Sequence, residues 1–358
     1  MLRTSVRRWL PAALVLTALL WPPTPAQARS KARLVPLRDA AASVQPAYAG
    51  RDDAMRFAAE VAERNGLDPD WARAALAPAR YVPDVARLIM PPPAGTAKDW
   101  ARYRSRVVEP SRIRAGLAFW RDNEKWLQLA EERYGVPAEI VVGIVGVETI
   151  FGQRTGGFRV IDALATLSFD FPTGRSDRSP FFRDELEQFL LLCQREGTDP
   201  LALKGSYAGA MGMPQFMPSS ILRFGIDFDE DGRIDLQGSS ADVIGSVAHY
   251  LAQFGWERDL PTHFAVTAPV QTRDRAIMLV HDIVPSFTPQ EFVEHGATLP
   301  DAALTLDGKL ALVELQNGDA APTYIAGTSN FYAITRYNWS SYYAMAVIEL
   351  GEVIRLRR

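Results

Sequence analysis

The sequence contains very few of the residues that form covalent or metal cross-links. Its 358 residues include one cysteine, Cys193, which excludes an intrachain disulfide and a cysteine-based zinc site. Its four histidines do not follow the His-x-x-x-His spacing of zinc peptidases. The chain also lacks a Walker A loop, a dinucleotide-binding glycine pattern and a Gly-x-Ser-x-Gly elbow. These absences disfavour disulfide, zinc, nucleotide and serine-hydrolase chemistry.

An excess of charge of one sign is also absent. The 39 Lys and Arg residues nearly balance the 42 Asp and Glu residues, giving a net charge of −3. This balance gives no basic bias toward nucleic acid or anionic membranes. Apolar residues make up 47% of the chain and charged residues 23%, which is typical of globular proteins. We therefore expect a globular protein with a substantial core and no nucleic-acid partner.

The first 28 residues are typical of an export signal. Arg3, Arg7 and Arg8 precede a short apolar run over residues 10–21, and a small-x-small cleavage pattern ends at Ala28. This run is too short for a membrane-spanning helix, which needs about 20 residues. We expect cleavage after about Ala28 and a periplasmic product. No cysteine follows the apolar run, so a lipid anchor is not expected.

Apolar spacing and turn signals divide the rest of the chain. Helical spacing dominates up to about residue 262, whereas short β-like runs separated by Pro, Gly and Asn-Gly turns follow it. We expect a mainly α (α+β) protein with a small β-rich insertion before the last helix. The expected parts are a signal peptide 1–28, a linker 29–50, an N-terminal helical domain 51–125, a helical core 126–262, the insertion 263–328 and a C-terminal segment 329–358.

The clearest candidate for chemistry is a glutamate at the end of an apolar helix. Every residue from Ile140 to Val147 is aliphatic or glycine, and a helix that is apolar all round is buried. Ile144 and Val145 precede Glu148 on the same helix face. Burial among aliphatic groups raises the pKa of a carboxyl, and an acid still protonated near pH 7 can donate a proton to a leaving group. The alternative is a solvated helix end, and this pattern alone leaves both open.

Four segments of the sequence form a set of long motifs. They are 145–152 (VGVETIFG), 205–220 (GSYAGAMGMPQFMPSS), 244–250 (IGSVAHY) and 335–347 (TRYNWSSYYAMAV). In this order they resemble the membrane-bound lytic murein transglycosylase B family, and the resemblance runs from about residue 57 to residue 354. Four long motifs in order form a far more specific signal than a single short pattern. The resemblance implies a lysozyme-like helical catalytic core, whose cleft the C-terminal segment completes.

The resemblance also implies an activity and a set of site residues. The family cleaves the β-1,4 bond between N-acetylmuramic acid (MurNAc) and N-acetylglucosamine (GlcNAc) in peptidoglycan without water, and forms a 1,6-anhydro ring. Glu148 would act as acid and then base, with no cofactor, on peptidoglycan glycan strands. A two-carboxylate hydrolase needs a second acid, which none of the four motifs places. The alternative for the implied substrate-binding residues is that they are ordinary core and turn residues. These residues are Ser206, Gln215, Tyr250, Tyr337, Asn338 and Tyr343.

An acidic loop over residues 227–242 begins like a calcium-binding EF-hand. Oxygen ligands stand at positions 1, 3 and 5, glycine at position 6 and a backbone carbonyl at position 7, but Gly238 replaces the usual glutamate at position 12. The resemblance implies a later aspartate as the last ligand. If Ca²⁺ binds here, we expect a structural role, and the alternative is a solvated acidic turn. The candidate ligands are Asp227, Asp229, Asp231, the carbonyl of Arg233, and Asp242.

Two alternative functions stay open at this point. A muramidase-type hydrolase would release reducing ends instead of anhydro ends. A non-catalytic peptidoglycan-binding protein would tolerate replacement of Glu148. A calcium sensor is disfavoured, because sensors usually pair two calcium loops and the sequence contains one.

Overall fold

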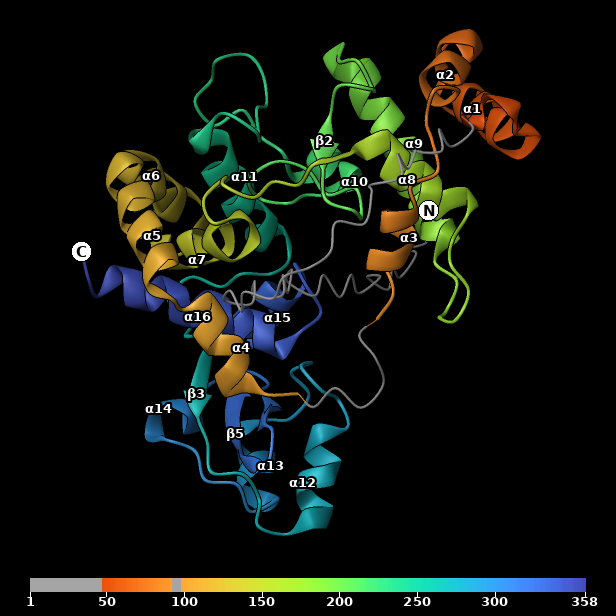
Figure 1. Ribbon diagram of the computed structural model, residues 1–358. Coiled ribbons are helices and arrows are strands. Elements are labelled where there is room, and N and C mark those ends of the chain that lie inside the picture. Colours follow the sequence, from red (N-terminus) through yellow and green to blue (C-terminus); the bar gives the residue numbers. More distant parts are fainter. Residues whose placement is uncertain (1–46, 92–97) are drawn as a thin grey trace, which may run out of the picture. The chain divides into compact units, whose positions relative to one another are not determined.

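The structure is a computed structural model that describes residues 47–91 and 98–358 (Figure 1). The expected signal peptide and most of the expected linker lie outside the described residues. Helices predominate and the strands form two small sheets, which confirms the expected mainly α (α+β) class. Within the described ranges, no helix has both the length and the apolar character needed to cross a membrane.

The described chain forms two compact units. One consists of residues 47–90 and 158–209, and the other of residues 91–157 and 210–358. The chain thus leaves the first unit after residue 90 and returns to it at residue 158. The domain boundaries expected from the sequence, after residues 50, 125 and 262, coincide with none of these changes.

The unit of residues 47–90 and 158–209 is helical, with one short strand pair. Tyr48 is buried and its hydroxyl donates to Asp170 Oδ2 at 2.5 Å, while Arg51 forms an ion pair with the same carboxylate at 2.6 Å. The last residues of the expected linker are therefore part of the fold. The elements are η1 (Tyr48–Gly50), α1 (Asp52–Asn65), α2 (Pro69–Leu76), α3 (Pro83–Leu88), β1 (Phe158–Arg159), α8 (Val160–Phe169), α9 (Ser179–Glu196) and β2 (Lys204–Gly205).

The other unit contains Glu148 and most of the candidate site residues. Its helices begin and end where the sequence provides caps. Pro110 opens α5 while Glu109 accepts from two of its first amides, and Gly135 ends α6 in the left-handed conformation. The helices outside the insertion are α4 (Trp100–Val107), α5 (Pro110–Asp122), α6 (Glu124–Tyr134), α7 (Ala138–Thr149), α10 (Pro218–Phe224), α11 (Ser240–Gln253), α15 (Ser329–Thr335) and α16 (Ser341–Arg355).

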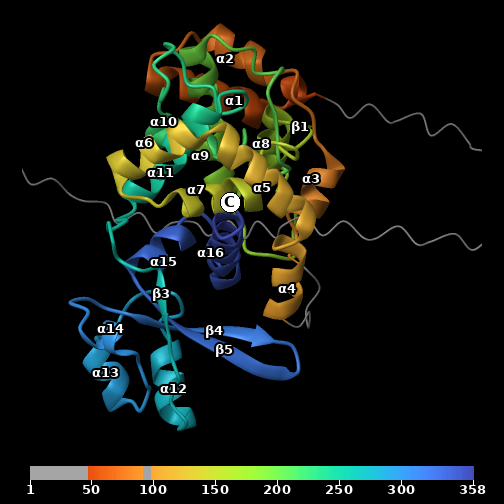
Figure 2. The ribbon, with the colours of Figure 1, turned by 90° about the vertical axis from the view of Figure 1, so that its left-hand side faces the viewer.

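Helices α7 and α16 pack closely because glycine lies at their contact points. A Cβ on Gly143 would lie 2.2 Å from the carbonyl oxygen of Val347, and a Cβ on Gly351 would lie 2.0 Å from that of Glu139. Any larger residue would separate the two backbones. Figure 2 shows α16 beside α7, with α4 on one side and α15 on the other. This contact fixes the C-terminal segment against α7, the helix whose last turn contains Glu148.

The insertion over residues 263–328 combines a three-stranded antiparallel sheet with short helices. The strand order is β3-β5-β4, and Asn317 and Gly318 begin the turn between β4 and β5, where Gly318 has a φ of 62°. The insertion contains strands, as its turn signals predict. It also contains three short helices, which were not predicted from the sequence. The elements are β3 (His263–Ala265), α12 (Thr272–Leu279), α13 (Pro289–Glu294), α14 (Asp301–Leu304), β4 (Ala311–Asn317) and β5 (Ala320–Gly327).

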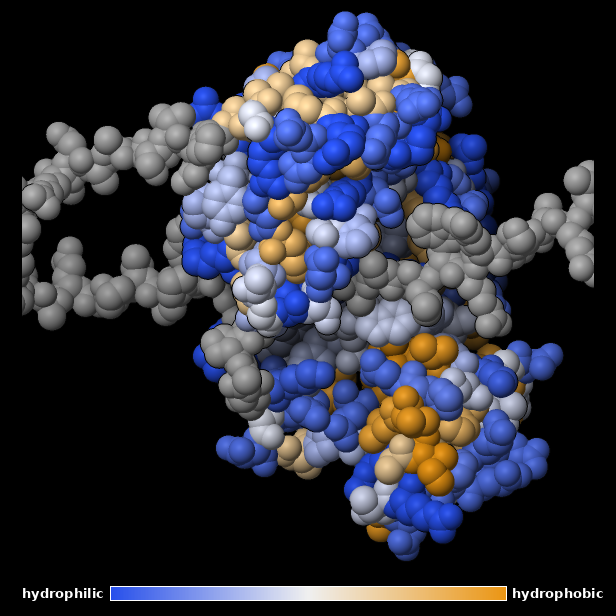
Figure 3. Space-filling view, turned by 90° about the vertical axis from the view of Figure 1, so that its right-hand side faces the viewer, coloured by the Kyte–Doolittle hydropathy of each residue, from blue (hydrophilic) through white to orange (hydrophobic). Residues whose placement is uncertain are grey.

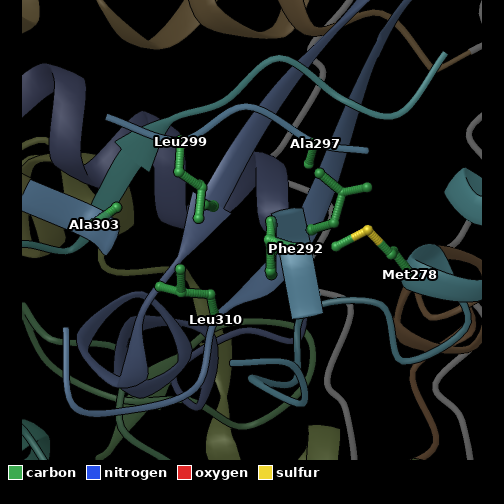
Figure 4. Packing of buried hydrophobic residues seen from close by; sticks show 8 residues of the cluster. Met278, Phe292, Ala297, Leu299, Ala303 and Leu310 are labelled. Atoms are coloured by element: carbon green, nitrogen blue, oxygen red, sulfur yellow. The ribbon is translucent and has the colours of Figure 1, made fainter. Parts of the chain in front are cut away.

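The insertion has a hydrophobic core of its own. Phe292 and Leu310 are fully buried, and Met278 and Leu299 pack in the same cluster (Figure 4). Apolar side chains also reach the surface of the insertion, in the lower part of the space-filling view (Figure 3). Val270 is 85% exposed and Val280 is 73% exposed. Exposed apolar side chains of this kind are normal on soluble proteins.

Candidate functional site

Glu148 lies in the last turn of α7, where the preceding residues are buried. The side chain itself is part-buried, whereas every residue from Ile140 to Val147 is buried. Burial raises the pKa of Glu148 to about 7, because an apolar environment disfavours the charged form. The rise expected from the helix pattern is therefore present, and a large fraction of the carboxyl is protonated at neutral pH.

Tyr343, in the first turn of α16, contacts the carboxyl directly. Its hydroxyl donates to Glu148 Oε1 at 2.6 Å, across 195 residues of sequence. This hydrogen bond favours the carboxylate and partly opposes the effect of burial on the pKa. Within the described ranges, nothing donates to the second oxygen, Oε2. Oε2 is thus the carboxyl oxygen to which the described residues donate no hydrogen bond.

The charge of Glu148 affects four tyrosines of the same unit. Burial raises the pKa of Tyr103, Tyr250, Tyr337 and Tyr343, and the charge of Glu148 raises each pKa further. No other carboxylate of the described residues contributes to these shifts. Among the carboxylates of the described residues, Glu148 is thus the one whose charge affects these four tyrosines.

The hydroxyls of two of these tyrosines are bonded within the protein. Tyr250 donates to the carbonyl of Arg336 at 2.7 Å, and Tyr337 donates to the carbonyl of Pro214 at 2.6 Å. Their ring centroids are 4.8 Å apart, and the ring of Tyr337 stacks on that of Tyr343 at 6.3 Å. Tyr250 and Tyr337 therefore connect the segments around Tyr343.

The amide of Gln215 joins two loops next to Glu148. Its Nε2 donates to the carbonyls of Gly212 at 2.9 Å and Thr155 at 3.1 Å, and its backbone has a φ of 52°. Asn338 is buried and directly follows Tyr337. Ser206 belongs to the other compact unit, where its Oγ accepts from the amide of Ala208 at 3.3 Å. Its place near Glu148 stays a prediction from the resemblance.

The turn after Glu148 is held in an unusual backbone conformation. Ile150 and Phe151 have φ values of 52° and 55°, which are unfavourable for bulky side chains. Thr149 stabilises this turn, because its Oγ1 accepts from the amide of Gly152 at 3.0 Å and donates to the carbonyl of Met213 at 2.9 Å. Sequence reasoning gave Thr149 no role, although it stands beside Glu148 in the first motif.

Tyr103 was also missed by sequence reasoning. It lies in α4, outside the four motifs, and its ring contacts those of Trp100 and Tyr342 at 6.2 and 6.1 Å. Tyr342 does not donate to Glu148 as its neighbour Tyr343 does. Its hydroxyl donates instead to the carbonyl of Gln316 at 3.0 Å. A lone tyrosine in an amphipathic helix gives no signal that distinguishes a site residue from a packing residue.

Three of the candidate calcium ligands lie together in the acidic loop. Carboxylate oxygens of Asp227, Asp229 and Asp242 lie within 4.8 Å of one another. Oδ1 of Asp229 is buried and has no hydrogen-bond partner, which is unfavourable for a carboxylate unless a cation binds it. Asp231 lies outside this cluster, and its oxygens accept from the backbone and side chain of Arg233. The donor set of hard oxygens fits Ca²⁺.

Known proteins are similar to this chain in sequence and in fold. The family model described as the transglycosylase SLT domain matches residues 50–352. The chain belongs to this family. It is 38% identical over 319 residues to membrane-bound lytic murein transglycosylase B of Escherichia coli (strain K12), covering 87% of this chain and 85% of that protein. The protein is therefore an enzyme of the lytic transglycosylase class, as the four motifs indicate.

Solved structures of the family have the same fold. Catenated SltB1 from Pseudomonas aeruginosa has a TM-score of 0.79 and 38% identity, covering 87% of this chain and 99% of that one. E. coli Slt35 in complex with calcium has a TM-score of 0.76 and 36% identity, covering 88% and 96%. P. aeruginosa SltB3 in complex with NAG-anhNAM-pentapeptide has a TM-score of 0.68 and 29% identity, covering 85% and 78%. The expected lysozyme-like fold is confirmed.

The hydrogen bond between Tyr343 and Glu148 gives a direct prediction for titration. Replacing Tyr343 by phenylalanine removes the interaction that favours the carboxylate, so the pKa of Glu148 should rise further, by about one unit. Carbon-13 NMR of labelled glutamate side chains measures this pKa. Tyr342→Phe removes a hydroxyl from the adjacent position and should leave the titration unchanged. An unchanged or lower pKa in Tyr343→Phe would contradict the assigned role of this hydrogen bond.

Proposed function

We propose that the protein cleaves the β-1,4 bond between MurNAc and GlcNAc in peptidoglycan and leaves a 1,6-anhydro ring on the MurNAc residue. The observation that most supports this proposal is a single carboxyl with a raised pKa among four tyrosines. A two-carboxylate glycosidase places its second acid about 5–10 Å from the first. Among the described residues, Glu148 is the one carboxylate whose charge affects the pKa of these tyrosines, and we infer that an intramolecular hydroxyl, not water, is the attacking group.

Glu148 acts in both steps of the proposed reaction. In the first step its protonated Oε2 gives the proton to the glycosidic oxygen, and the C1–O bond breaks with its electron pair going to the departing GlcNAc. In the second step the C6 hydroxyl of MurNAc attacks C1, and its proton passes to the Glu148 carboxylate. The acid is regenerated and no water is consumed. The acetamido group of the substrate stabilises the cationic intermediate, and no cofactor takes part.

The remaining site residues orient the sugar chain. Tyr343 fixes Oε1 of Glu148, so that Oε2 is the oxygen directed to the substrate. The ring faces of Tyr250 and Tyr337 suit packing against pyranose rings. The amide of Gln215 and the polar groups of Asn338 and Ser206 suit hydrogen bonds to sugar hydroxyl and acetamido groups. These roles rest on the family resemblance together with the contacts around Glu148.

The Glu148→Gln variant tests the proposed acid. We expect kcat to fall by about 10²- to 10⁴-fold, because the amide cannot transfer a proton, while binding of glycan strands persists. Glu139→Gln changes another acid of the same helix and should keep its activity. Mass analysis of muropeptides released from purified sacculi by the wild-type enzyme should show 1,6-anhydro ends. Reducing ends would identify a muramidase-type hydrolase, and an active Glu148→Gln variant would exclude Glu148 as the acid.

We also propose that the acidic loop binds Ca²⁺ as a structural ion. Asp227, Asp229 and Asp242 would hold it, with Asp231 and the carbonyl of Arg233 as the further ligands that the EF-hand pattern indicates. A bound cation would neutralise this acidic cluster and pair the buried Oδ1 of Asp229. A relative solved in complex with calcium supports this proposal.

The loop is connected to the site by two hydrogen bonds. The carbonyl of Leu236 accepts from the amide of Met213 at 2.8 Å, and the carbonyl of Met213 accepts from Thr149 Oγ1 at 2.9 Å. Because Thr149 directly follows Glu148, a rigid loop would help to fix the turn that contains the acid. The role of the ion is therefore to stabilise the fold near the site.

Calcium binding gives a prediction for stability. Adding Ca²⁺ to the chelator-treated protein should stabilise the wild type, by about 2.7 kcal/mol when Ca²⁺ is at 100 times its Kd. Asp229→Asn should lose most of this gain. Glu230→Gln removes the same charge from an exposed position of the same loop and should respond like the wild type. Thermal unfolding with and without Ca²⁺ measures both, and an equal response of the two variants would contradict the proposed ligand set.

The place of action follows from the substrate. Peptidoglycan lies outside the cytoplasmic membrane, so we propose that residues 1–28 direct export to the periplasm and are then removed. The E. coli relative is named as membrane-bound.

A further inference from the structure

Arg112 in α5 and Arg154 in the segment that follows Glu148 have no carboxylate ion-pair partner among the described residues. Arg112 is part-buried in the first turn of α5, and its Nε is buried without a hydrogen-bond partner. Its Nη1 donates only to the carbonyls of Val107 at 3.2 Å and Arg106 at 3.5 Å. Arg154 is exposed. A cation in the first turn of a helix is disfavoured by the helix dipole, so Arg112 is not explained by helix stability.

The packing of α5 brings these two arginines to the same side of the site. Gly116 lies one turn after Arg112 on the same helix face, and a Cβ on Gly116 would lie 2.9 Å from the ring of Phe151. Arg154 follows Phe151 by three residues, and its amide donates to the carbonyl of Thr149 at 2.9 Å. The face of α5 that carries Arg112 therefore packs on the turn that leads to Arg154.

Electrostatic effects agree with this placement. The pKa of Arg112 is lowered, mainly by burial and also by the charge of Arg154, although Glu109 acts in the opposite direction. Burial raises the pKa of Tyr103 to about 12, with a further rise from the charge of Glu148 and an opposing effect from Arg112. The charges of Glu148 and Arg112 thus both affect Tyr103, and the charge of Arg154 affects Arg112.

We propose that Arg112 and Arg154 form a subsite for a carboxylate carried by the MurNAc residue of the substrate. Guanidinium groups bind carboxylates with paired, charge-assisted hydrogen bonds, and a part-buried cation without a carboxylate partner gains most from such an anion. This inference rests on the proposed function. It adds a selectivity, because the enzyme then prefers strands whose MurNAc substituent is negatively charged.

Peptidoglycan offers such a carboxylate from two sources. A peptide-free strand carries the free lactyl carboxylate of MurNAc, whereas a peptide-bearing strand carries the carboxylates of its stem peptide. A relative was solved with a peptide-bearing ligand. The shared chemistry is a carboxylate on the lactyl side of MurNAc, and the substrates of the experiment distinguish its source.

The experiment compares defined strands that differ only in their carboxylates. Arg112→Gln, Arg154→Gln and wild type are assayed on peptide-free and peptide-bearing strands, and on each after its carboxylates are converted to amides. On the strand whose carboxylate binds, each variant should lose about tenfold in kcat/KM, mainly through KM. On the amidated strand the wild type should fall to the level of the variants. Arg112→Lys keeps the charge and should recover part of the loss.

Matched controls separate this role from a structural one. Arg114→Gln removes an exposed arginine of the same helix and should match the wild type on every strand. If Arg112→Gln does not fold, the Arg154→Gln variant still tests the subsite, because Arg154 is exposed. Equal losses on carboxylate and amidated strands, or no loss in Arg154→Gln, would overturn the subsite alone. A wild-type enzyme that cleaves none of the strands would overturn the proposed function and this inference together.

Discussion

The close contact between α7 and α16 is the constraint on which the site depends. Gly143 and Gly351 leave no space for a side chain at the two points where these helices meet. Because the backbones approach so closely, the start of α16 lies beside the end of α7, and Tyr343 reaches the carboxyl of Glu148. The acid and its partner are 195 residues apart in sequence, so this single helix contact assembles the centre of the site.

Two opposing effects set the properties of the proposed acid. Burial favours the protonated carboxyl, while the hydroxyl of Tyr343 favours the carboxylate, and the balance is a pKa of about 7. A value near neutrality suits a group that must first give a proton and then take one back. The surrounding tyrosines provide ring faces and hydroxyls without adding a competing charge. One carboxyl with two successive roles is the arrangement that a non-hydrolytic cleavage requires.

Much of this arrangement could be predicted from the sequence, because some of its causes are local. The apolar residues before Glu148 predict both a buried helix and a raised pKa, and four ordered motifs indicate the family. The pairing of Tyr343 with Glu148 could not be predicted from spacing, since it depends on how distant helices pack. For the same reason Tyr103 and the pair of Arg112 and Arg154 gave no signal. The return of the chain to its first unit at residue 158 was also missed, because no change of composition marks it.

The pH dependence of stability tests the central claim, which is that the apolar environment of the part-buried Glu148 raises its pKa. Its folded pKa of about 7 lies above the ordinary value of 4.5, so its protonated form favours the folded state and this contribution is lost as the pH rises. Chemical unfolding of wild type and Glu148→Gln should show the variant gaining about 2 to 3 kcal/mol relative to wild type between pH 5 and pH 8. A constant difference across this range would contradict the account.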